Sequence, residues 1–84
     1  MKHCMITFRS VTPAQRAEGA LRRAGISCAL QRTPRQLEER GCGYCLRMSC
    51  IQLPQALELL EKGMISFQKT YGIREGGRWE EMDP

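Results

Sequence analysis

The sequence predicts an α+β domain, a ferredoxin-like split βαβ sandwich with a four-stranded antiparallel sheet and two helices on one face. Four segments alternate between apolar and polar residues as strands do, and two others carry apolar stripes at helical spacing. Their order is strand, helix, strand, strand, helix, strand (β-α-β-β-α-β), which gives two βαβ units with right-handed crossovers. A chain of 84 residues allows one domain. We expect it to span residues 1–74, with residues 75–84 forming a mobile acidic tail.

The first half of the chain predicts a strand, a helix and a second strand. Residues 4–9 and 26–31 each alternate with a period of two, which is typical of half-buried strands. Between them, Thr12 followed by Pro13 predicts the start of a helix, because threonine caps helices and proline suits the first turn. Gly25 is expected just beyond the end of this helix, where glycine adopts the left-handed conformation without strain.

The second half predicts a strand at residues 44–49, then a helix, then a strand at residues 64–73. Two starts of this helix remain open. Ser49 with Gln52 would form a capping box, but Pro54 then lies late in the first turn, so an irregular first turn is the alternative.

Apolar residues define the faces of these later elements. The second helix is expected to end at Gly63, and its apolar face consists of Leu53, Ala56, Leu57 and Leu60. The last strand places on one side Ile65, Phe67, Tyr71 and Ile73. The connection at residues 33–43 is polar and longer than the usual hairpin loop, which indicates a functional segment.

Charge and hydropathy limit the class of protein. Residues 1–50 carry nine lysines or arginines against three acidic residues. These arginines are dispersed and lack the interleaved aromatic residues that stack on bases, so nucleic-acid binding is not favoured. No run of about 18 apolar residues is present to span a membrane. The N-terminus also lacks the apolar stretch of a secretory signal, so we expect a cytoplasmic protein with no membrane partner.

Five cysteines are many for a chain of this length, and a reducing cytoplasm would leave them as free thiols. Cys4 and Cys28 share the parity of their apolar neighbours, so we expect small core residues there. Cys50 precedes the second helix, where we expect a partly exposed residue whose pKa the helix dipole can lower.

The candidate chemistry lies in the segment Gly41-Cys42-Gly43-Tyr44-Cys45-Leu46-Arg47. Cys42 lies between two glycines at the junction of loop and strand, where packing does not require a cysteine. A thiolate there is favoured by the positive charges nearest in sequence, Arg35, Arg40 and Arg47. Cys45 is a candidate resolving thiol or second metal ligand, or else a strand residue without a role.

Three chemistries fit the Cys-x-x-Cys spacing. A thioredoxin-type dithiol is rejected, because only 39 residues follow Cys45 and a strand pattern begins at once. A site for zinc or another soft metal would use Cys42, Cys45 and Cys50, but no second Cys-x-x-Cys supports it. A carrier needs only one accessible thiolate that accepts a sulfur or selenium atom as a persulfide or perselenide.

Short motifs between Met5 and Ile73 match one family: Ile6-Thr7-Phe8, Ala17-Glu18, Leu21, Ala24-Gly25-Ile26, Thr33-Pro34-Arg35, Cys42-Gly43, Leu46-Arg47 and Ala56-Leu57-Glu58. On these motifs the chain resembles the putative selenium/sulfur carrier protein-like family. The resemblance implies a carrier cysteine at Cys42, with Pro34, Arg35 and Arg47 at the matching turn and basic positions. It also implies a pyridoxal-phosphate cysteine desulfurase as a donor of sulfur.

We therefore predict a carrier, rather than a turnover enzyme, that holds a persulfide or perselenide on Cys42 and passes it to an acceptor protein. It is expected to need no cofactor, with Cys45 as a resolving thiol and the following residues around the carrier thiol: Pro34, Arg35, Arg40, Gly43 and Arg47. One alternative is a small Cys-x-x-Cys module for metal binding or thiol-redox regulation. Another is an interaction module that forms a homodimer.

Overall fold

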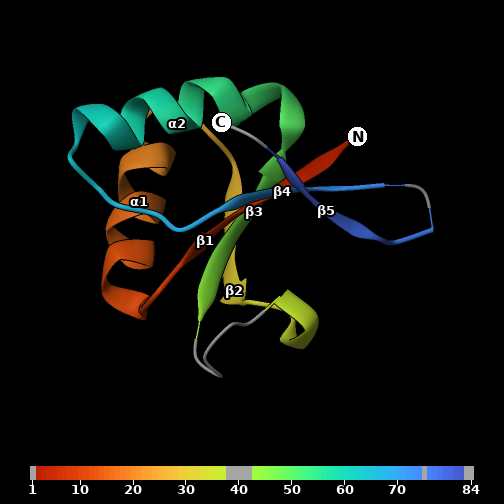
Figure 1. The fold of residues 1–84 in the computed structure, drawn as a ribbon. Helices are drawn as coiled ribbons and strands as arrows, with labels where there is room; N and C mark the ends of the chain where they lie inside the picture. Colours follow the sequence, from red (N-terminus) through yellow and green to blue (C-terminus); the bar gives the residue numbers. More distant parts are fainter. Residues whose placement is uncertain (1, 38–42, 75, 83–84) are drawn as a thin grey trace.

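The computed structural model describes residues 2–37, 43–74 and 76–82. Two α-helices lie on the same side of an antiparallel sheet (Figure 1). The elements in chain order are β1 (His3–Phe8), α1 (Val11–Arg23), β2 (Cys28–Arg32), the 3-10 helix η1 (Arg35–Leu37), β3 (Tyr44–Ser49), the 3-10 helix η2 (Cys50–Gln52), α2 (Leu53–Lys62), β4 (Thr70–Ile73) and β5 (Trp79–Met82). The α+β prediction is confirmed.

In the described residues the sheet has five strands in the order β2-β3-β1-β4-β5, so the prediction of four strands is wrong. The added strand β5 pairs with β4 along the sheet edge, within the segment that the sequence assigned to the tail. Its sequence Trp79-Glu80-Glu81-Met82 has two adjacent acidic residues and no alternation, which hides it from a period-of-two search. Trp79 and Met82 are half-buried, while Glu80 and Glu81 are exposed.

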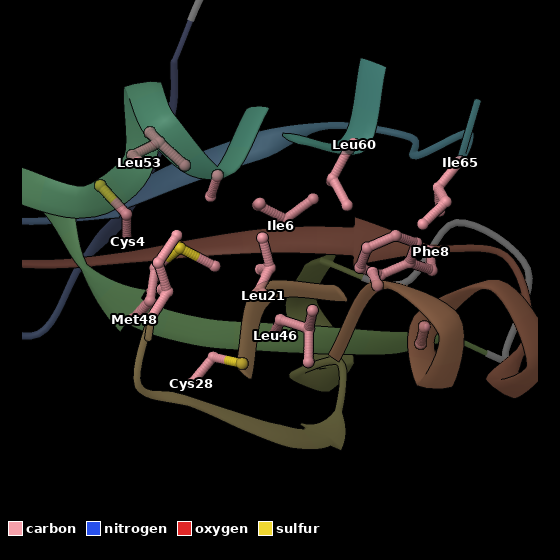
Figure 2. Close-up of a cluster of buried hydrophobic side chains, with 14 residues drawn as sticks. Cys4, Ile6, Phe8, Leu21, Cys28, Leu46, Met48, Leu53, Leu60 and Ile65 are labelled. Carbon is pink, nitrogen blue, oxygen red and sulfur yellow. The ribbon is translucent and has the colours of Figure 1, made fainter. Parts of the chain in front are cut away.

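The main core lies between the two helices and the face of the sheet that they cover (Figure 2). As the alternation predicted, Cys4, Ile6 and Phe8 of β1 all point into it. The other buried members are Ala14, Ala17, Leu21, Ile26, Cys28, Leu46, Met48, Leu53, Ala56, Leu60 and Ile65. Burial of this apolar surface is the main force that holds the helices against the sheet.

The opposite face of the sheet carries a smaller apolar cluster of Met5, Cys45 and Tyr71. Leu37 of η1 and Trp79 of β5 pack against it and cover part of this face. The neighbouring positions Met5, Cys45 and Tyr71 come from β1, β3 and β4, so the cluster crosses the middle of the sheet.

The last predicted strand is shorter than expected because an extra residue interrupts its pairing with β1. The amide of Thr7 donates to the Lys69 carbonyl oxygen at 2.9 Å, while the Gln68 amide donates to the Thr7 carbonyl oxygen at 2.7 Å. Gln68 and Lys69 thus lie opposite the single residue Thr7, as in a β-bulge. Beyond the bulge, the alternation of side chains between the two faces of the sheet is shifted by one residue. For this reason Phe67 packs on the main core but Tyr71 lies on the opposite face, so the prediction that they share a face is wrong.

The first helix begins at Val11 with Ser10 in the capping position, two residues before the predicted Thr12. Its end is as predicted: Gly25 has a φ of 83°. The Gly25 amide donates to the Arg22 carbonyl oxygen at 3.0 Å, and the Ile26 amide donates to that of Leu21 at 2.9 Å. These bonds form a Schellman motif, which needs a left-handed residue at this position.

The second helix follows one of the two predicted starts, the irregular first turn, and it ends where predicted, with Lys62 as its last residue and Gly63 in the capping position. Before it lies the irregular first turn, η2, in which the Ser49 hydroxyl accepts a hydrogen bond from the Ile51 amide at 3.4 Å. At its end Gly63 has a negative φ, and the left-handed residue is Met64, with a φ of 55°. The Ile65 amide donates to the Leu60 carbonyl oxygen at 2.9 Å, so the same motif forms here with a methionine in place of glycine.

A disulfide joins Cys4 of β1 to Cys50 of η2, so the expectation that all five thiols are free is wrong. Cys4 pairs with Met48 in the sheet, and β3 leads directly into η2, which brings Cys50 back over the start of β1. The two Cα atoms are 5.0 Å apart, a separation that suits a disulfide.

We predict that Met64→Gly raises the free energy of unfolding by about 1 kcal/mol, because a Cβ atom is strained in the left-handed conformation. Met64 is 88% exposed, so its side chain contributes little burial. Chemical denaturation measures the change. The matched control is Met64→Ala, which keeps the Cβ atom and is expected to give no comparable gain; equal gains for both variants would contradict the strain.

We also predict that reduction of the disulfide lowers the free energy of unfolding by about 2–4 kcal/mol, since the bond closes a loop across 46 residues of sequence. Denaturation with and without a phosphine reductant measures this difference. The variant Cys50→Ser should be insensitive to the reductant; an equal loss of stability in that variant would mean that another effect of the reductant is responsible.

Candidate functional site

The ends of three strands meet at one edge of the sheet, beside the candidate segment. Tyr44, the first residue of β3, pairs with both Phe8 at the end of β1 and Arg32 at the end of β2. Gly43 precedes it, and its carbonyl oxygen accepts a hydrogen bond from the Thr33 amide at 3.1 Å. A Cβ atom at Gly43 would lie 3.2 Å from the Thr33 hydroxyl oxygen, so glycine allows the close approach of these two segments.

The predicted carrier thiol Cys42 and the predicted basic neighbour Arg40 lie outside the described residues, so their roles stay predictions. The described residues on either side of them are Leu37 and Gly43. Leu37 is the last residue of η1 and packs against the cluster of Met5, Cys45 and Tyr71. This cluster lies on the face of the sheet that the helices do not cover, which we call the open face.

Positive charge gathers at this end of the sheet. Arg9, Arg32 and Arg35 are exposed there, at the ends of β1 and β2 and in η1. Arg32 lies over the ring of Tyr44, with its guanidinium carbon 5.6 Å from the ring centre. Lys69, just before β4, forms an ion pair with Glu81 at 3.3 Å. The site is thus basic, although part of the charge of Lys69 is neutralised.

A hollow of about 270 Å³ opens at the same end, between η1 and the ends of β1 and β4. Its lining includes the cationic residues Arg9 and Lys69 together with Thr7 and Leu37. Polar side chains of this kind suit a small anionic group. The hollow lies on the same face of the sheet as Cys45, since Thr7 and Cys45 are paired neighbours on β1 and β3.

Pro34 and Arg35, the predicted turn and basic positions, both lie within the described residues. The Pro34 carbonyl oxygen accepts a hydrogen bond from the Leu37 amide at 2.9 Å, which closes the single turn of η1. Arg35 is the first residue of that turn and is exposed to solvent. Both residues therefore lie at the basic end of the sheet, and their part in a carrier site stays a prediction.

Arg47 lies elsewhere. It follows Gly43 by four positions in the sequence, which is about 13 Å along an extended strand. Its guanidinium carbon is 5.6 Å from the ring centre of Trp79 on β5, a cation–π contact. The sequence did not mark Trp79 as a partner, because β5 was not predicted. The Arg47 side chain therefore lies on the open face of the sheet, against β5, and not at the basic end.

Cys45 is fully buried, in the cluster that it forms with Met5 and Tyr71 on the open face. Burial raises the pKa of its thiol to about 11, because the charged form loses its hydration. The side chains of Gln31 and Thr33 and the charge of Arg47 oppose this rise but do not cancel it. At neutral pH the thiol is therefore protonated and sealed from solvent, which does not suit a resolving thiol in this conformation.

The other cysteines in the described residues are also unreactive as they stand. Cys28 is buried in the main core, as predicted, and burial raises the pKa of its thiol against the lowering effect of Arg22. Cys4 is buried as predicted but is bonded to Cys50.

The alternative metal set of Cys42, Cys45 and Cys50 is not assembled in the described residues. Cys50 is held in the disulfide and follows β3, whereas Cys45 lies near the start of that strand. They are five positions apart in the sequence, which is about 16 Å in an extended chain. Within residues 2–37, 43–74 and 76–82, no three histidine, cysteine, aspartate or glutamate side chains gather as metal ligands would.

Comparison with known proteins gave one match. A family model described as Putative Se/S carrier protein-like matches residues 3–72 of the chain. Neither the curated proteins nor the solved structures gave a match. The matched range contains both helices, β1 to β3, all of β4 except its last residue, and all residues of the candidate segment. Separately, no helix in the described part of the chain is long and apolar enough to cross a membrane.

We predict that the burial of Cys45 makes the protein less stable as pH rises from about 9 to 11. The folded thiol stays protonated up to a pKa of about 11, whereas the unfolded thiol releases its proton near the ordinary cysteine value. Deprotonation then favours the unfolded state, by about 2–3 kcal/mol for a shift of two pKa units.

Denaturation of wild type and Cys45→Ala at several pH values isolates this effect from the titration of other groups. The difference in unfolding free energy between the two proteins should shrink as pH rises, because only the wild type loses the contribution of the protonated thiol. A constant difference from pH 8 to pH 11 would mean that Cys45 titrates alike in both states.

Proposed function

We propose that this chain, which belongs to the Putative Se/S carrier protein-like family, carries sulfur or selenium as a persulfide or perselenide on Cys42. The observation that carries the proposal is the match of the family model over residues 3–72. A carrier of this kind needs one nucleophilic thiolate and no deep catalytic pocket. It accepts the atom from a donor and releases it to an acceptor protein.

The state of the other thiols supports Cys42 as the carrier. Cys4 and Cys50 are joined to one another, and Cys28 and Cys45 are buried with raised pKa values. A protonated, buried thiol is a poor nucleophile, because the thiolate is the reactive form. Among the five cysteines, we therefore assign the carrier role to Cys42.

The charge at that end of the sheet supports the same assignment. Arg9 and Arg35 are exposed there, and positive charge stabilises a thiolate and the anionic persulfide that follows from it. The hollow lined by Arg9 and Lys69 provides room for the anionic part of a donor. Arg47 is assigned no direct part, since its side chain lies over Trp79.

The transfer step is a displacement at sulfur. The Cys42 thiolate attacks the outer sulfur of a donor persulfide, a new sulfur–sulfur bond forms on Cys42, and the donor leaves as a thiolate. A cysteine desulfurase that uses pyridoxal phosphate is the proposed donor, because it generates a persulfide from cysteine. The same displacement in reverse, with an acceptor thiolate, unloads the carrier. Cytoplasmic location is part of this proposal.

We further propose that the six elements β1, α1, β2, β3, α2 and β4 form a ferredoxin-like core to which β5 is an addition. The strand order β2-β3-β1-β4 with both helices on one face supports this relationship.

The test is to incubate the full chain with a cysteine desulfurase and cysteine and to measure intact mass. We expect a gain of one sulfur atom that peptide mapping places on Cys42 and that a thiol reductant removes. Cys42→Ser should abolish the gain, whereas Cys45→Ser and Cys28→Ser should keep it. Sulfur found on Cys28 or Cys45, or an unchanged gain in Cys42→Ser, would contradict the assignment.

The contribution of charge is tested by the rate of loading. Arg35→Gln should slow sulfur uptake several-fold, because it removes positive charge next to the candidate segment. Arg16→Gln is the matched control, since Arg16 is an exposed arginine on α1. Equal rates in the two variants would exclude Arg35 from the site and leave the role of Cys42 untouched.

A further inference from the structure

Three sulfur atoms from distant parts of the sequence meet at the other end of the sheet. Cys4 of β1 is bonded to Cys50 of η2, and the sulfur of Met82 in β5 lies 3.6 Å from the sulfur of Cys4. Cys4 is fully buried, whereas Cys50 and Met82 are half-buried. The group is therefore enclosed on the core side and reachable from solvent on the other.

Strand pairing or hydrogen bonds hold the backbone of each of these three residues in place. Met82 pairs with Thr70 in the sheet, and its carbonyl oxygen accepts a hydrogen bond from the Thr70 hydroxyl at 3.0 Å. The Cys50 amide donates to the Lys2 carbonyl oxygen at 3.0 Å. Cys4 lies within β1, which is paired on both sides. Reduction of the disulfide thus leaves three sulfur-bearing positions anchored near one another.

The surroundings are apolar. Cys4 lies beside Met48 and Leu53 at one end of the main core (Figure 2). On β4, the residue paired with Cys4 is Gly72, which has no side chain to separate Cys4 from β5. His3 is exposed and belongs to the opposite parity of β1, so it does not add a nitrogen ligand on this face.

We propose that in the reduced protein the thiolates of Cys4 and Cys50 and the thioether of Met82 bind one Cu(I) ion. Thiolate and thioether sulfur are soft ligands that select Cu(I), whereas zinc prefers four ligands that include nitrogen or a fourth thiolate. Metal–sulfur bonds of about 2.3 Å place three sulfurs around one ion about 4 Å apart. The separation of Cys4 and Met82 is already close to this value, so only Cys50 has to withdraw when its bond is broken.

Reduction of the disulfide has to come before Cu(I) binds. Two equivalents of a thiol reductant cleave the Cys4–Cys50 bond, and the products are two protein thiols and one molecule of the reductant's disulfide. Binding of Cu(I) then releases the protons of the two thiols to solvent, and the metal keeps its oxidation state. The disulfide form has no thiolate to offer, so binding depends on reduction.

Titration of the full chain with Cu(I), under anaerobic conditions and against a chromophoric Cu(I) chelator, tests the proposal. The experiment is run on wild type and in a Cys42→Ser, Cys45→Ser background, which removes the Cys-x-x-Cys pair as a competing site. In that background the reduced protein should withdraw one equivalent of Cu(I) from the chelator, and the disulfide form should withdraw none. Zinc in place of Cu(I) should bind at least tenfold more weakly.

Two variants decide whether these three sulfurs are the ligands. Met82→Leu keeps the volume of the side chain and should weaken Cu(I) binding about tenfold or more, while Met64→Leu, at an exposed methionine far from the disulfide, should have no effect. Cys50→Ser should abolish binding, with circular dichroism to verify the fold. X-ray absorption of the loaded protein should show sulfur neighbours alone.

Equal affinity in Met82→Leu and Met64→Leu, or oxygen or nitrogen neighbours in the absorption spectrum, would overturn the proposed site. So would unchanged binding after oxidation to the disulfide. None of these measurements depends on sulfur loading of Cys42. A negative result for the Cu(I) site would therefore leave the proposed carrier role unaffected, and the reverse also holds.

Discussion

The pairing of β1 with β3 is the constraint on which the rest of the structure depends. It is antiparallel and runs from His3 opposite Ser49 to Phe8 opposite Tyr44, through the centre of the sheet. This register directs Ile6 and its alternate neighbours toward the helices and leaves the other parity on the open face. It also determines what lies at each end of the sheet, since β3 has Gly43 just before it and η2 just after it. A shift by one residue would exchange the two faces and expose the core.

Much of the fold follows from patterns within short segments. Alternation is sufficient to identify the residues of β1 and β2 that face the helices, including Cys28, although β1 is buried on both faces from Cys4 to Phe8. The end of α1 is equally local, since Gly25 supplies the left-handed residue that the Schellman motif requires. After α2 the left-handed residue is Met64, which the sequence does not mark, because a positive φ is uncommon for residues other than glycine.

What the sequence did not predict depends on contacts between distant segments. The bulge opposite Thr7 exists only because β1 pairs with β4, and no pattern in residues 64–73 reveals it. The Cys4–Cys50 bond follows from the strand register rather than from cysteine spacing. With hindsight a signal existed: one cysteine lies near the start of the first strand and another directly after its antiparallel neighbour. The candidate site was predicted as a basic loop, and its described part is basic, but the position of Arg47 depends on β5.

The two groups of sulfur atoms lie at opposite ends of β3, and this separation has a chemical consequence. Gly43 precedes the strand and Cys50 follows it, and its six residues span about 20 Å. Thiol–disulfide exchange requires the attacking sulfur to contact the disulfide directly. Under the proposed function, a persulfide on the residue next to Gly43 would form about the length of β3 away from the Cys4–Cys50 bond. The paired strands between the two ends would then keep the proposed sulfur transfer apart from reduction of the disulfide.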